Sequence, residues 1–394
     1  MSVRAVPSHV PSRRALLKTA GAASGALAAL PLTAGSAQAA PAPKGAGAAA
    51  TGRFRTRVVL LGTAGGRTWW TGSERQGISS ALVVQDAVYL VDFGDGWGRR
   101  YLQAGLGGPD GSLGLARLEA AFLTHLHSDH IADLSGLFTF GPTDGLTARH
   151  RPVQVFGPGS RGSLPPLAGS PTTDPPVINP QDPVPGTAAT TEYLYQAFAN
   201  DLNDNIRDSL KPDPRTLVRT TDITLPDGLV TDPDHDSAPR MAPIHVFEDA
   251  RVRVTTTLVN HPPVFPAFAF RFDTDDGSVV FSGDTSPCDN LVRLAEGADM
   301  LVHEVIDKEW VTNKFPTPPS PEQQAKMDHL LRSHTTIEDV GRVAEQAGVK
   351  TLVLNHLAPA DNPRHRWLRA QRGFAGRLIV GEDLDHIGVG SPAP

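Results

Sequence analysis

Residues 121–130 read AFLTHLHSDH, so an apolar run typical of a buried strand is followed at once by three histidines and one aspartate. Because alternate side chains of an extended segment point the same way, we expect His125 and His127 to face one side. A turn at Ser128 would bring Asp129 and His130 to the same space. Imidazole and carboxylate groups are the ligands that a zinc-like ion prefers. The segment therefore predicts a two-metal site, with ions roughly 3.5–4 Å apart, rather than a histidine-rich surface loop.

Three further candidate ligands lie at the ends of predicted strands. His261 follows residues 251–259, Asp284 follows residues 279–282, and His356 follows residues 349–354. Each of them alone would be explained equally well as a core or surface residue. Together with the first segment they supply enough ligands for two ions. The predicted metal ligands are His125, His127, Asp129, His130, His261, Asp284 and His356.

These motifs resemble the metallo-β-lactamase superfamily, in which a His-x-His-x-Asp-His segment is joined by strand-end histidines and by a sequence such as SGDT at residues 282–285. LGT at 61–63, LVHE at 301–304 and HTT at 334–336 are similar to its ribonuclease Z branch, which also holds secreted arylsulfatase-like and phosphodiesterase-like enzymes. The resemblance covers roughly residues 56–390 apart from one insertion. It implies an α/β fold, specifically an αββα four-layer sandwich.

The resemblance also implies roles for individual residues. His125, His127 and His261 would bind one ion, Asp129, His130 and His356 the other, and Asp284 would bridge both. The cofactor would be two divalent metal ions, with zinc expected and iron or manganese as alternatives. The implied catalytic residues are Asp129, which would orient the attacking water, and His334, which would donate a proton to the leaving group. For His303, a structural role at a strand end is as well supported as a role in the site. Family members often dimerise, so a homodimer is compatible with the resemblance.

The rest of residues 56–394 reads as one hydrolase domain. Apolar runs predict strands at 58–61, 81–84, 88–91, 244–247 and 267–272, and capping signals predict a helix at 336–346. Residues 157–243 are rich in proline, and 12 acidic against 6 basic residues lie between 157 and 246. This stretch is expected to be a loop-rich insertion with a helix at 191–210. The adjacent Trp69 and Trp70 are expected to belong partly to the core, with an aromatic-lined pocket as the alternative.

The N-terminal 39 residues differ in kind from the rest. They combine Arg13-Arg14-Ala15-Leu16-Leu17-Lys18 with a short apolar stretch and end in Ala37-Gln38-Ala39, which resembles a cleavable Tat export signal. Residues 40–55 read as a flexible linker. The prediction is export by the Tat machinery to a secreted or cell-envelope location, without a membrane anchor in the mature form. The single cysteine, Cys288, permits no intrachain disulfide.

The charge balance favours a small substrate. Residues 1–39 carry four basic residues and no acidic one, so their removal would change the net charge from −6 to −10. Since a polyanion gains little general attraction from such a chain, nucleic acid is not the expected partner. The leading hypothesis is an exported hydrolase that uses a hydroxide held between two ions to cleave a small ester: an aryl sulfate, a phosphodiester or a lactone. The alternatives are a ribonuclease Z-like 3′-tRNA-processing endonuclease and a non-catalytic metal-binding protein, which would lack a ligand.

Overall fold

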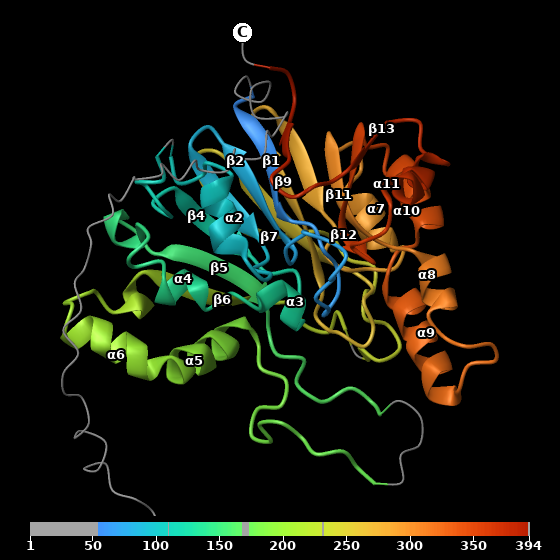
Figure 1. Ribbon diagram of the computed structural model, residues 1–394, viewed down its shortest axis with the longest axis horizontal. Coiled ribbons are helices and arrows are strands. Elements are labelled where there is room, and N and C mark those ends of the chain that lie inside the picture. Colours follow the sequence, from blue (N-terminus) through green and yellow to red (C-terminus); the bar gives the residue numbers. More distant parts are fainter. Residues whose placement is uncertain (1–53, 109, 168–172, 231, 393–394) are drawn as a thin grey trace, which may run out of the picture. The chain divides into compact units, whose positions relative to one another are not determined.

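The computed structural model describes residues 54–392 apart from residues 109, 168–172 and 231, and within them two seven-stranded sheets face each other (Figure 1). The strand order of the first sheet is β14 (His386–Gly388), β1 (Thr56–Gly62), β2 (Ser79–Val84), β3 (Ala87–Val91), β4 (Leu118–Phe122), β5 (Val153–Pro158) and β6 (Val218–Ile223). The order of the second is β13 (Arg377–Val380), β12 (Thr351–Ala358), β11 (Met300–Ile306), β10 (Gly277–Phe281), β9 (Phe268–Thr274), β8 (Arg253–Leu258) and β7 (Ile244–Glu248).

Helices cover the outer faces of both sheets (Figure 1). Those near the first sheet are α2 (Trp97–Gln103), α3 (Ser128–Ile131), α4 (Gly136–Thr139), α5 (Thr187–Ala197) and α6 (Ala199–Arg207). Those near the second are α7 (Asp289–Leu294), α8 (Lys308–Asn313), α9 (Pro321–Ser333), α10 (Ile337–Gln346) and α11 (Arg364–Trp367). Short 3₁₀ helices span Leu146–Ala148, Pro214–Thr216 and Leu368–Gln371.

Strand alternation divides most of the apolar side chains of the described strands between three large clusters. In β1, Val58 and Leu60 belong to the cluster between the two sheets, whereas Val59 and Leu61 pack against the outer helices. A third cluster joins the outer face of the second sheet to α7, α10 and α11. Both faces of each sheet are therefore covered, which explains why these strands are continuous apolar runs. The predicted αββα sandwich is confirmed.

The helix predicted at 336–346 is confirmed as α10, with Thr336 at its N-cap. The Thr336 hydroxyl donates to Asp339 Oδ2 at 2.7 Å rather than accepting a backbone hydrogen bond. The helix expected at 191–210 differs, because it is divided at Phe198 into α5 and α6.

The stretch 157–243 contributes more to the sheet than expected. Residues 218–223 form β6, the edge strand, which pairs in parallel with β5. Only Val218 and Ile223 of this strand are buried, and the intervening residues are Arg, Thr, Thr and Asp, so the sequence carried no apolar signal for it.

The predicted export signal at 1–39 and nearly all of the predicted linker lie outside the described residues, so both stay predictions. Among the residues that are described, no helix is long and apolar enough to cross a membrane.

Candidate metal centre

The histidine-rich segment forms the turn between β4 and α3. His127 is the N-cap of α3, with extended backbone angles, and Asp129 and His130 lie in the helix itself. This change from strand to helix folds the four side chains onto one another, as expected. The ring centroids of His125 and His127 are 4.7 Å apart, and those of His125 and His130 are 4.0 Å apart.

Two irregularities of the second sheet aim the remaining side chains at this segment. Asn355 pairs with Glu304 and Leu357 with Val305, so His356 is the extra residue of a β-bulge, and it has a φ of 44°. A bulge of this kind turns a side chain away from the regular pleat. Just before Asp284, Gly283 has a φ of 58°, and a Cβ there would lie 2.5 Å from the carbonyl oxygen of Phe268. Only glycine fits this position without strain.

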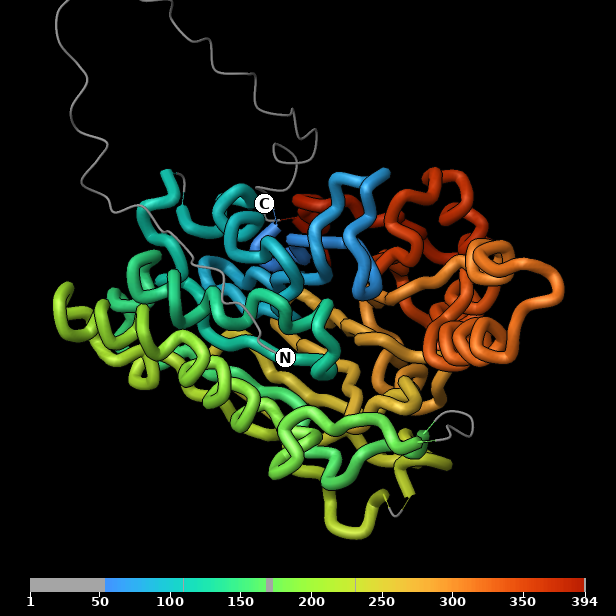
Figure 2. The backbone as a smooth tube through the Cα atoms, turned by 60° about the horizontal axis from the view of Figure 1, so that its bottom comes forward, coloured from blue at the N-terminus to red at the C-terminus, as the bar shows by residue number. Residues whose placement is uncertain are grey.

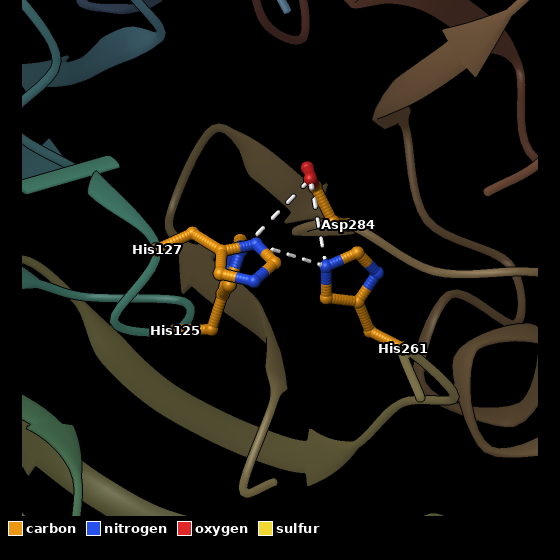
Figure 3. Close-up of side chains that lie close together, drawn as sticks. All are labelled: His125, His127, His261 and Asp284. Atoms are coloured by element: carbon orange, nitrogen blue, oxygen red, sulfur yellow. Dashed lines mark hydrogen bonds and ion pairs between the residues drawn. The ribbon is translucent and has the colours of Figure 1, made fainter. Parts of the chain in front are cut away.

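The side chains predicted as ligands converge into two groups that share Asp284. His125, His127, His261 and Asp284 form one group (Figure 3), and Asp129, His130, Asp284 and His356 form the other. Within each group, one ligand atom per residue lies within 4.8 Å of all the others. Asp284 Oδ1 lies 3.3 Å from His130 Nε2, and Asp284 Oδ2 lies 3.3 Å from His356 Nε2.

Several polar atoms of this cluster fit bound cations. His125 Nε2, His130 Nε2 and Asp284 Oδ1 are buried and have no hydrogen-bond partner among the described residues. Buried polar atoms without partners are costly, and two divalent ions, one in each group, would satisfy all three. Burial lowers the pKa of His125 and of His261 well below 6.5, which keeps both in the neutral form that binds metal.

The electrostatic field at His130 also favours positive charge. Burial alone would lower the pKa of His130, but the carboxylates of Asp284, Asp92 and Asp129 raise it well above 6.5. For Asp284, burial opposes ionisation, yet the neighbouring His356 and His130 hold its pKa well below 3.8. A divalent cation would meet the same carboxylates that favour the imidazolium.

Hydrogen bonds from outside the cluster fix the histidine rings. Asp92 Oδ2 accepts from His130 Nδ1 at 2.8 Å, and the Thr124 amide and hydroxyl both donate to Asp92 at 2.8 Å. His261 Nδ1 lies 2.8 Å from the carbonyl oxygen of Ser333. Such partners set the tautomer and aim Nε2 at the metal site. Asp92 was not predicted from the sequence as a site residue, although it follows the apolar strand β3 and is itself buried.

His334 lies beside the two groups and is held by Glu304. Its Nδ1 is 3.1 Å from Glu304 Oε1 and 3.9 Å from Asp284 Oδ2. Glu304 Oε1 also accepts from the amides of Thr285 at 3.0 Å and Thr335 at 3.1 Å. Burial alone would lower the pKa of His334, but the Glu304 carboxylate raises it to about 9. His334 is therefore positioned as a protonated, and thus proton-donating, group.

His303 points away from the site. It shares its face of β11 with Leu301 and Val305, which pack in the cluster beneath the outer helices, whereas Glu304 alternates to the opposite face. Its Nδ1 lies 2.7 Å from the Glu304 carbonyl oxygen. Of the two roles considered for His303, the structure favours support of the strand end.

The loop 63–70 adds a rim to the site. The Gly66 amide donates to Asp129 Oδ2 at 3.1 Å, so the following residues start beside the cluster. Trp70 packs edge-on against Trp310, with ring centroids 5.6 Å apart, which fits the expectation of a partial core role. Trp69 does not fit it, because its side chain is 88% exposed.

Comparisons with known proteins agree with this architecture. The family model described as the metallo-beta-lactamase superfamily matches residues 74–195. Proteins named ribonuclease Z from Mycobacterium bovis and Mycobacterium marinum are each 32% identical over 335 residues, covering 84% of this chain and 98% of the relative. The solved structure of human tRNase Z, short form, has a TM-score of 0.54 and 17% identity, covering 84% of this chain and 99% of that one, and shows the fold.

This chain is a metal-dependent hydrolase of the metallo-β-lactamase superfamily, whose members bind divalent metals. The fold, the two groups of clustered side chains and the match to the family model all agree on this class. The hypothesis of a non-catalytic protein is not supported, since no predicted ligand is missing. Within the superfamily, the identity shared with the mycobacterial proteins over nearly their whole length shows that this chain belongs to the ribonuclease Z family.

Two expectations from the sequence are wrong. The relatives named ribonuclease Z contradict an exported hydrolase of small esters as the leading function, and they contradict the expectation that nucleic acid is not a partner. The charge argument failed because net charge averages over the whole chain, whereas binding of RNA depends on the local field. Near the site, burial is the largest influence that lowers the pKa of His127 and of His329. Arg67 lowers both pKa values further, and Arg332 and Lys326 also lower that of His329, so these cations lie close to the site.

Proposed function

We propose that this chain is a two-metal ribonuclease that cleaves a phosphodiester bond in precursor tRNA. The observation that carries the proposal is the 32% identity to proteins named ribonuclease Z across 98% of the relative's length. A match of that extent covers far more of the chain than the histidine motif alone. We take tRNA as the RNA substrate because the sequence motifs of this chain resemble those of ribonuclease Z.

For the metal ions, we assign His125, His127 and His261 to one ion and Asp129, His130 and His356 to the other. Asp284 would serve both, because it is the residue shared by the two groups. Imidazole-rich sites with a bridging carboxylate suit zinc, which is the ion that we expect. When bound, two such ions would activate water at neutral pH and neutralise charge on the phosphate.

Side chains of this chain would orient the attacking water and donate a proton to the leaving group. Asp129 Oδ1 is buried and has no hydrogen-bond partner among the described residues, so it can accept a hydrogen bond from the attacking water. The Gly66 amide holds the other carboxylate oxygen of Asp129 in place. On the leaving side, His334 would give its Nε2 proton to the departing ribose oxygen, while Glu304 stabilises the imidazolium through Nδ1.

The proposal is tested with the purified, zinc-loaded protein and a precursor tRNA that carries a 3′ trailer. We expect one cut, which His125→Ala abolishes and which a matched change at an exposed histidine, His245→Ala, leaves unaffected. A tRNA with a mature 3′ end serves as the substrate control. Efficient hydrolysis of p-nitrophenyl phosphodiesters without any cleavage of the precursor tRNA would refute the proposal.

A further inference from the structure

A cavity of about 480 Å³ opens beside the metal centre, on the side of His127. Three segments form its wall. The first is the ligand segment itself, through Leu126 and His127; the second is the loop after His261, through Val264 and Phe265; and the third is the segment 158–190, through residues such as Arg161. Figure 2 shows residues 158–167 and 173–190, in green, across the end of the molecule where the loop after His261 also lies.

Hydrogen bonds within the second and third segments hold these parts of the wall in shape. The Ser160 hydroxyl donates to the Val184 carbonyl at 2.8 Å, and the Thr187 hydroxyl donates to the Pro158 carbonyl at 3.0 Å. In the second segment, the Val264 amide donates to the His261 carbonyl at 2.9 Å. Much of the remaining wall is proline, whose fixed φ limits motion. The cavity is therefore largely formed before a ligand arrives, which lowers the entropic cost of binding.

Arg161 provides a charged group in a wall that is mostly apolar. Its side chain is 5% exposed and forms an ion pair with Asp234, and its Nη1 donates to the Ser163 carbonyl at 2.9 Å. Its Nε is buried and has no hydrogen-bond partner among the described residues. The guanidinium has five N–H donors, so these two hydrogen bonds leave donors on Nη1 and Nη2 that a ligand could use. Since Asp234 already balances the guanidinium charge, the cavity suits a neutral hydrogen-bond acceptor better than a second phosphate.

A nucleobase matches this cavity in shape and polarity. It is flat and apolar on both faces, it carries neutral acceptor atoms at its edge, and with its ribose it fits a cavity within the usual size range of ligand sites. Single-stranded RNA is commonly bound by stacking of bases on aromatic and guanidinium planes with hydrogen bonds to their edges. Phe265 and Arg161 offer those two kinds of plane.

We propose that this cavity receives the base of a nucleotide next to the scissile phosphate, with the guanidinium of Arg161 donating to an acceptor at the edge of the base. The proposal rests on the ribonuclease function proposed above. The cavity adjoins the metal centre, because His127 lines the cavity and also belongs to the first ligand group. A phosphate held at the metal centre thus has its neighbouring nucleotide at the mouth of the cavity.

The first test leaves the protein unchanged. Precursor tRNAs are made with a single abasic ribose at one or the other nucleotide flanking the cleavage site. Because stacking of one base is worth about 1–3 kcal/mol, we expect kcat/KM to fall about 5- to 160-fold for one of the two abasic substrates. Unchanged cleavage of both abasic substrates would overturn the proposal.

The second test fills the cavity. Val184→Trp places an indole in it, whereas Val177→Trp makes the same change at an exposed position of the same segment that does not line the cavity. We expect Val184→Trp to lower kcat/KM for intact precursor tRNA at least about tenfold. On the abasic substrate that the wild-type protein cleaves slowly, the same variant should lower kcat/KM little further, because the missing base and the added indole remove the same contact.

Equal cleavage of intact precursor tRNA by Val184→Trp and Val177→Trp would refute the cavity as a base-binding site while leaving the ribonuclease function intact. Absence of any RNA cleavage by the wild-type protein would refute both proposals. The melting temperatures of the two variants show whether a loss reflects binding or folding.

Discussion

Replacing Glu304 by Gln removes a charge beside His334 while keeping the side-chain volume. Burial lowers the pKa of His334, and the Glu304 carboxylate, 3.1 Å from Nδ1, is the largest influence that raises it to about 9. Without this carboxylate, we expect the pKa to fall to about 6.5 or below. At pH 7.5 the protonated fraction of His334 would then drop from nearly complete to about one tenth.

This change predicts a specific pattern in the rates. For precursor tRNA, whose leaving ribose oxygen needs a proton, kcat should fall about tenfold or more at pH 7.5 and recover as the pH is lowered to about 6. For a p-nitrophenyl phosphodiester, whose leaving group departs without a proton, the rate should change little. The assay is a pair of pH–rate profiles, with metal content measured alongside. An unshifted basic limb for the tRNA substrate, or equal losses on both substrates, would contradict the role assigned to His334.

The remaining predictions concern the backbone, the ring-fixing hydrogen bonds and the N-terminus. Gly283→Ala should lower the free energy of unfolding by about 1–3 kcal/mol in thermal melts, because a Cβ at φ 58° would approach the Phe268 carbonyl to 2.5 Å, whereas Gly98→Ala, with open space around it, should be neutral or stabilising. Asp92→Asn should weaken metal binding about 10- to 100-fold in a chelator competition, since it disturbs the hydrogen bond to His130 Nδ1; unchanged affinity would show that Asp92 does not support the site. Replacing Arg13 and Arg14 together by Lys should block export of the full chain, as followed by cell fractionation, and normal export would argue against a Tat signal.

The predicted ligands could be found from the sequence because they are placed by local rules. Each lies where an apolar run ends, and the carboxyl ends of neighbouring strands meet at one rim of a sheet. His261 and Asp284 could therefore be grouped with the first segment from the sequence alone, and the structure brings all of them together. The alternation of buried residues likewise made the two central sheets predictable, as Val58 and Val59 illustrate on opposite faces of β1.

The supporting residues could not be found in this way, because their partners are distant in sequence. Asp92 meets His130 across 38 residues, and Glu304 meets His334 across 30. A buried carboxylate looks the same in a sequence whether it orients a histidine or ends a strand. The cavity beside His127 was also out of reach, since it depends on segment 158–190 lying against the loop after His261.

The prediction of a small-ester substrate was wrong for a related reason. A net charge is a property of the whole chain, whereas substrate choice depends on the few side chains that face the site. Arg67 and Arg332 act on histidines at its rim, although acidic residues elsewhere determine the total. The exposure of Trp69 could not be inferred from a Trp-Trp pair of which one member, Trp70, does pack inward.

Metal content per chain, measured by inductively coupled plasma mass spectrometry after zinc loading and desalting, probes the two-ion site most directly. The wild-type protein and Glu304→Gln should each hold two ions, and Asp284→Ala should retain neither, because Asp284 belongs to both ligand groups. A wild-type content of one ion, or two ions retained by a folded Asp284→Ala variant, would contradict a centre built around a shared carboxylate.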